Sequence, residues 1–132
     1  MKKLLRKILL VDDDAVTNLL NEYILKSAGV SEQIVVCSSG EKALGLLTDP
    51  EIANEVDLIF LDINMPGMSG FEFIDKYRKT NLPRYAPVVL MTTSISYKDK
   101  GLARRYEILG YFDKPLDKKK LNAFFARFVP TG

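Results

Sequence analysis

Residues Val56 to Gly70 read VDLIFLDINMPGMSG, an apolar segment that ends abruptly on an aspartate. The apolar residues do not alternate with polar ones, which indicates a strand buried on both faces, as in a parallel sheet. After Asp62, a proline, a serine and two glycines follow within eight residues. Turn formation accounts for those residues. A carboxylate held at the end of a buried strand is also a candidate nucleophile or metal ligand.

Short apolar segments alternate with amphipathic segments along the rest of the chain. We predict strands over residues 7–11, 33–38, 57–62, 87–93 and 107–112. We predict helices over residues 15–29, 40–47, 70–79, 97–106 and 117–128. The first helix is predicted from apolar residues at helical spacing, with Gly29 at its end: Val16, Leu19, Leu20, Tyr23 and Ile24. This order predicts an α/β fold with a doubly wound (βα)₅ parallel sheet, whose functional residues gather beyond the carboxyl ends of the strands.

The composition bounds the class of protein. A chain of 132 residues, 47% of them apolar, predicts one folded domain. The net charge of +2 gives no reason to expect direct binding to nucleic acid. The single Cys37 favours a reducing compartment, and we expect a cytoplasmic protein. Arg6 and Lys7 interrupt the apolar N-terminal segment, so we expect neither a secretory signal nor a membrane anchor.

The chain contains no histidine, so a bound metal must take oxygen ligands, which suits Mg²⁺ or Mn²⁺. Polar residues follow four of the five predicted strands: Asp12, Asp13, Asp14, Asp62, Thr92, Thr93 and Lys114. Each has an ordinary explanation alone, since Asp13 or Asp14 could cap a helix and Lys114 could be a solvated loop residue. Three carboxylates at one rim, however, repel one another unless a cation lies between them.

These groups together suit phosphoryl transfer. Mg²⁺ neutralises charge on a phosphoryl group, while Lys114 and a threonine hydroxyl can bind its other oxygens. Asp62, which stands alone at the end of its strand, is the best candidate to attack phosphorus and form an acyl phosphate.

Four segments, ILLVDDD, DLIFLDINMPGMSG, PVVLMTT and YFDKPL, occur in this order, and with them the sequence resembles a response-regulator receiver domain of the CheY-like family. The resemblance implies a flavodoxin-like sheet with strand order 2-1-3-4-5. It also implies a stand-alone receiver over 1–132, with a core from about 6 to 129 and no output domain. Such a domain accepts a phosphoryl group from a sensor histidine kinase or a histidine phosphotransfer protein, and turns over no external substrate.

The resemblance implies a role for each residue of the site. Asp62 is the phosphoacceptor and Lys114 binds phosphate. Asp13 is a direct Mg²⁺ ligand, Asp12 is a ligand directly or through water, and the backbone carbonyl of Asn64 completes the set. The switch residues are Thr92 and Tyr111, and the family often has a cis bond before the residue that corresponds to Pro115. Two departures are a larger residue at Thr93 and the pair Glu107 and Ile108, where the family usually has Gly-Ala.

Three alternatives remain at this stage. A flavin-binding electron carrier should have a loop that cradles phosphate where this chain has three aspartates. An aspartate-nucleophile phosphatase should have an acid where this chain has Asn64. A receiver without its own effector could act as a phosphate relay or sink.

The resemblance also implies an output surface over 97–106, 107–112 and 117–128, which phosphorylation would switch. That surface is expected to be basic, and either to dock an acidic partner or a second copy of the chain, or to be only a solvated flank. Its predicted basic residues are Lys98, Lys100, Arg104, Arg105, Lys118, Lys119 and Lys120.

Overall fold

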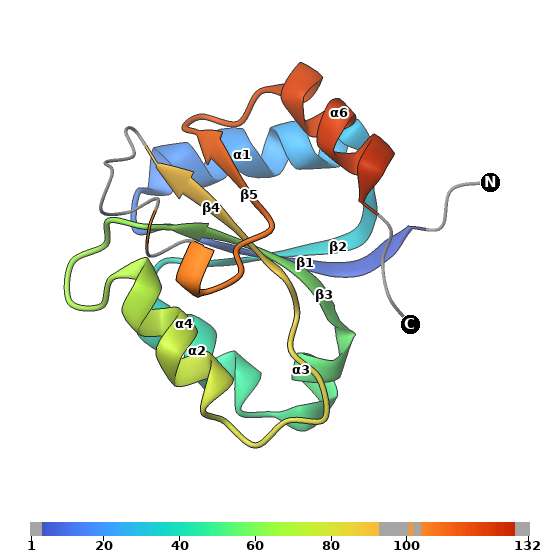
Figure 1. The fold of residues 1–132 in the computed structure, drawn as a ribbon. Coiled ribbons are helices and arrows are strands. Elements are labelled where there is room, and N and C mark those ends of the chain that lie inside the picture. The colour runs from blue at the N-terminus through green and yellow to red at the C-terminus, as the bar shows by residue number, and fades with distance from the viewer. Residues whose placement is uncertain (1–3, 93–100, 102–103, 129–132) are drawn as a thin grey trace.

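The computed structural model describes residues 4–92, 101 and 104–128, and in these the strands form one parallel sheet in the order β2-β1-β3-β4-β5 (Figure 1). The strands are β1 (Leu5–Val11), β2 (Ser31–Cys37), β3 (Val56–Asp62), β4 (Val88–Thr92) and β5 (Gly110–Asp113). Every residue of β3 is buried, as its unbroken apolar sequence predicts. The predicted doubly wound α/β fold and strand order are confirmed.

Helices cover both faces of the sheet (Figure 1). One face carries α1 (Ala15–Ala28) and α6 (Lys118–Arg127), and the other carries α2 (Gly40–Leu47), α3 (Pro50–Glu55) and α4 (Gly70–Arg78). Two apolar clusters fill the layers, one around Leu10, Phe60 and Leu121 and the other around Leu9 and Phe73. Among the described residues, none of the helices has the length and apolar character that a membrane span requires.

The region between β4 and β5 differs most from the sequence prediction. Most of the predicted helix 97–106 lies outside the described residues, although Gly101, Arg104 and Arg105 are helical. The fifth strand begins at Gly110 rather than at Glu107. Glu107 has a φ of 55°, in the left-handed region, which ends the helical segment and delays the strand. Non-glycine residues rarely adopt this conformation.

Helix α1 forms as predicted, but its buried side is not the apolar one. Gly29 ends it with a φ of 64° and donates its N–H to the Lys26 carbonyl at 3.1 Å. The buried side chains are those of Asn18, Asn21 and Leu25. The apolar side chains that predicted the helix lie mostly in solvent, where Val16, Leu19, Leu20 and Tyr23 are exposed. The α1–sheet contact therefore combines two polar side chains with Leu25, and an apolar stripe faces outward.

An additional short helix, α3, precedes β3. Asp49 caps it by accepting a hydrogen bond from the N–H of Glu51 at 2.9 Å, and Pro50 occupies its first turn. Its six residues are too few to show the periodicity on which helix prediction rests, so the sequence does not predict this helix.

Candidate acidic site at the carboxyl ends of the strands

The acidic residues after β1 and β3 meet because the two strands are parallel neighbours. Val11 pairs with Leu61 in the sheet register, so Asp12 and Asp62 emerge at the same edge. One carboxylate oxygen from each of Asp12, Asp13 and Asp62 lies within 4.8 Å of the other two. The convergence expected from the strand ends is therefore present in the structure.

Asp12 is fully buried, and both of its carboxylate oxygens accept hydrogen bonds. Oδ1 accepts from the N–H of Asp14 at 2.9 Å, and Oδ2 accepts from Lys114 Nζ at 3.1 Å. Asp14 itself caps α1 by accepting from the N–H of Val16 at 3.2 Å and from the hydroxyl of Thr17. Asp14 is therefore the acid that caps α1, while Asp12 and Asp13 lie beside Asp62.

The stiff turn after β3 lets α4 begin directly against the backbone of Asp62. A Cβ at Gly70 would lie 2.7 Å from the Asp62 carbonyl oxygen and 3.0 Å from the Cα of Ile63, so only glycine fits there. The N–H of Gly70 donates to the Ile63 carbonyl at 2.9 Å, and Gly67 has a φ of 83°. The turn therefore packs the start of α4 against the strand end that carries Asp62.

Lys114, which follows β5, places a positive charge beside Asp12 and Asp62. Its Nζ lies 3.1 Å from Asp12 Oδ2 and 3.3 Å from Asp62 Oδ2. Burial disfavours the ammonium form, but the two carboxylates outweigh burial and raise the pKa of Lys114. The N–H of Lys114 donates to the carbonyl of Thr92 at 3.0 Å, which ties this loop to the end of β4. The Lys114–Pro115 bond is cis.

Asp62 is a buried acid whose negative charge is only partly balanced by its neighbours. Its side chain is buried, and Oδ1 accepts one hydrogen bond from the N–H of Asn64 at 3.2 Å. Oδ2 is within ion-pair distance of Lys114 but completes no hydrogen bond. Burial, and then the charge of Asp12, raise the pKa of Asp62 to about 6 against the opposing effect of Lys114. A buried carboxylate oxygen without a hydrogen bond, beside two further acids, fits a small divalent cation that prefers oxygen ligands.

The remaining predicted site residues lie around this group. Thr92 is buried at the end of β4, whereas Thr93 lies outside the described residues. Asn64 follows Asp62 in the turn with its side chain exposed. Tyr111 on β5 is 44% exposed, so its ring is not packed into the site.

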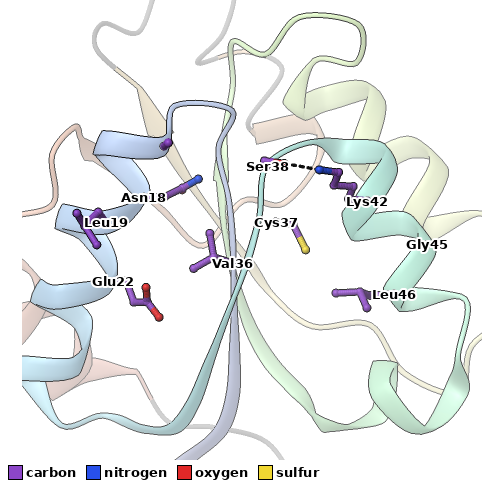
Figure 2. Close-up of a pocket in the computed structure, with 10 residues that line it drawn as sticks. Asn18, Leu19, Glu22, Val36, Cys37, Ser38, Lys42, Gly45 and Leu46 are labelled. Atoms are coloured by element: carbon purple, nitrogen blue, oxygen red, sulfur yellow. Dashed lines mark hydrogen bonds between the residues drawn. The ribbon is translucent and has the colours of Figure 1, made fainter.

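A separate surface cavity of about 710 Å³ lies between α1 and α2, above the edge strand β2 (Figure 2). Apolar groups such as Leu19, Val36 and Leu46 make up much of its lining, and Lys42 on its α2 side donates a hydrogen bond to Ser38 at 3.0 Å. None of the three clustered acids, nor Lys114, lines it. The acid cluster is therefore not part of this cavity.

Comparison with known proteins identifies the family. The model of the response regulator receiver domain matches residues 8–126. The transcriptional regulatory protein CpxR of Escherichia coli (strain K12) is 35% identical over 120 residues, which cover 90% of this chain and 47% of CpxR. The chain thus spans about half the length of such curated relatives. An uncharacterized 14.6 kDa protein from Leptolyngbya boryana is 32% identical over 114 residues, which cover 86% of this chain and 82% of that protein.

Solved structures give the same result. A two component response regulator from Cytophaga hutchinsonii superposes with a TM-score of 0.83 at 30% identity and covers 95% of this chain and 97% of its own. The Vibrio cholerae chemotaxis protein CheY4 superposes with a TM-score of 0.79 at 26% identity, with coverages of 95% and 99%. The match over residues 8–126 and these likenesses show that the chain belongs to the response regulator receiver domain family of two-component systems.

Proposed function

We propose that this chain accepts a phosphoryl group on Asp62 from a phosphohistidine of a sensor histidine kinase or a histidine phosphotransfer protein. The observation that carries the proposal is Asp62 Oδ2, a buried carboxylate oxygen that completes no hydrogen bond and lies 3.3 Å from Lys114 Nζ. The chain has no histidine, so the donor must be a separate residue outside it.

In this proposal each group of the site has one task. One carboxylate oxygen of Asp62 forms a bond to phosphorus while the bond from phosphorus to the donor imidazole nitrogen breaks, and the other oxygen remains available to a cation. Asp12, Asp13, Asp62 and the Asn64 carbonyl would hold Mg²⁺, or Mn²⁺ in its place, and a cation bound there would supply charge neutralisation for the phosphoryl oxygens. Lys114 binds one phosphoryl oxygen, and the Thr92 hydroxyl binds another. The movement of Thr92 toward the phosphoryl group then lets the Tyr111 side chain turn inward.

Labelling with acetyl phosphate separates this proposal from a phosphatase. A receiver should gain one phosphoryl group per chain in a Mg²⁺-dependent reaction, and then release phosphate no faster than that adduct decays. A phosphatase should release phosphate many times per chain from an added phosphomonoester. The amide at Asn64, where a phosphatase would need an acid, favours the first outcome.

The exposed apolar stripe of α1 supports a protein donor that docks beside the site. Leu19 is 69% exposed and Tyr23 is 72% exposed, and Val16 and Leu20 extend the same surface. Helix α1 begins at Ala15, three residues after Asp12, so the stripe starts next to the acids. Exposed apolar surface of this kind is typical of a protein-binding site.

We expect Leu19→Glu to slow phosphotransfer from a protein donor without affecting acetyl phosphate. The donor is the histidine kinase or phosphotransfer protein of the source organism that labels the wild type fastest. A charge in an apolar contact should reduce the transfer rate at limiting donor by about tenfold. Ser27→Glu, an exposed position at the far end of α1, is the matched control and should transfer normally. Equal losses with the protein donor and with acetyl phosphate would contradict docking on α1.

The basic surface on the β5 side is the proposed output surface. Arg104, Arg105, Lys118, Lys119 and Lys120 are exposed, while Lys98 and Lys100 lie outside the described residues. We expect phosphorylation to increase binding of an acidic partner, or self-association, at this surface. Lys119→Glu should weaken that binding and its salt dependence while Asp62 is still labelled. If neither Lys119→Glu nor Thr92→Ala changes this binding, the output surface lies elsewhere on the protein.

A further inference from the structure

Asn21 is a fully buried amide on α1 that contacts the end of β4 and the loop that follows β5. Its Oδ1 accepts a hydrogen bond from the backbone N–H of Leu116 at 2.8 Å. Its Nδ2 donates to Met91 Sδ at 3.6 Å. Leu116 lies two residues beyond Lys114, and Met91 immediately precedes Thr92. One side chain therefore contacts the neighbours of both groups proposed to bind phosphoryl oxygens.

The position demands an amide rather than an apolar side chain. The Leu116 N–H needs an acceptor and the Met91 sulfur can use a donor, and an asparagine supplies both from one planar group. A leucine of similar volume would supply neither and would leave the buried N–H of Leu116 without a partner. Leu25, one turn further along α1, is equally buried but is an ordinary apolar core residue.

The Lys114 segment has a hydrogen bond at each end. The N–H of Lys114 donates to the Thr92 carbonyl, and the N–H of Leu116 donates to Asn21. The first bond connects the loop to β4, but only the second connects it to the helix that follows the acids of β1. Without the second, the loop keeps its attachment to β4 and the Lys114 side chain keeps its contacts with Asp12 and Asp62, but the backbone of the loop is no longer tied to α1.

We propose that Asn21 is a positioning residue, which through its bond to the Leu116 N–H holds Lys114 at the correct distance from Asp62 for phosphoryl transfer. The inference rests on the proposed function, because Lys114 needs exact placement only if a phosphoryl group binds between it and Asp62. Asn21 touches neither the phosphoryl group nor the metal. Its effect must pass through Lys114.

The test is labelling of Asn21→Leu by acetyl phosphate, measured as initial rate against acetyl phosphate concentration. A misplaced Lys114 should raise the half-saturating concentration and reduce the rate at low concentration by about tenfold. Mg²⁺ affinity, measured by calorimetry, should stay within about twofold, because the proposed metal ligands are not moved. In a Lys114→Met background, Asn21→Leu should cause no further loss of labelling.

Leu25→Ala is the control for lost stability, and all assays are made where circular dichroism shows each variant to be folded. It should lower the melting temperature and leave labelling unchanged. Asn21→Ala serves in place of Asn21→Leu if the latter does not fold. Wild-type chain that takes no phosphoryl group would refute the proposed function, and this inference with it. A labelled wild type matched by Asn21→Leu, or a loss that persists in the Lys114→Met background, would overturn only the role of Asn21.

Discussion

Asp62→Asn is expected to stabilise the metal-free protein, by up to roughly 3 kcal/mol at pH 8. The pKa of Asp62 is raised in the folded chain to about 6 from its ordinary 3.8, because the carboxylate is buried beside Asp12. Its contribution to stability is therefore fully present below pH 3.8 and is lost as the pH rises through 6. An asparagine carries no such charge, so the variant avoids this loss.

Urea unfolding in EDTA, at pH 4.5 and at pH 8, measures the effect. The difference between Asp62→Asn and wild type should be clearly smaller at pH 4.5, where the loss is only partial, than at pH 8, where it is complete. Saturating Mg²⁺ should reduce it, because a cation that binds the folded wild type stabilises it by mass action. Asp113→Asn, at an exposed carboxylate that is paired only with Lys120 among the described contacts, should show no such pH dependence. A difference independent of pH, or of opposite sign, would contradict the electrostatic account of the site.

Lys114→Met is expected to reduce the rate of Asp62 labelling by at least about 100-fold, the usual loss for a preorganised group that stabilises developing charge. The lysine also lowers the pKa of Asp62, so its removal should raise that pKa further. The pH at which labelling is half-maximal should then move upward, because only the ionised carboxylate attacks phosphorus.

Initial rates with acetyl phosphate and saturating Mg²⁺, across the pH range, test both parts of this prediction. Lys120→Met removes a lysine that is paired with Asp113 and not with the acid cluster, so it should behave as wild type. Labelling of Lys114→Met within threefold of wild type, with an unchanged pH profile, would show that Lys114 has no part in the transfer.

The fold could be predicted because its signals are local. The unbroken apolar sequence of β3 indicates burial on both faces, and the alternation of strand and helix then determines a parallel sheet. The same topology brings the residues after β1 and β3 to one edge, so the acid cluster could also be predicted. Asp62, Asp12, Asp13 and Lys114 were each found because they stand at strand ends.

The features that could not be predicted depend on contacts that appear only once the chain is folded. Asn21 is buried against the Leu116 N–H, a hydrogen-bond partner 95 residues away, and the sequence near Asn21 gives no sign of that partner. The apolar stripe of α1 therefore predicted the helix but not its buried side. Gly70 looked like an ordinary turn residue, and only the structure shows the backbone that it touches.

The most direct test of phosphoryl transfer to Asp62 is the intact mass of the chain after incubation with acetyl phosphate and Mg²⁺. Wild type should gain the mass of one phosphoryl group, hydroxylamine should remove it, and borohydride trapping should locate it at Asp62. Asp62→Asn should gain nothing under the same conditions. An adduct of equal yield on Asp62→Asn, or one located at another residue of the wild type, would contradict the assignment of Asp62 as the phosphoacceptor.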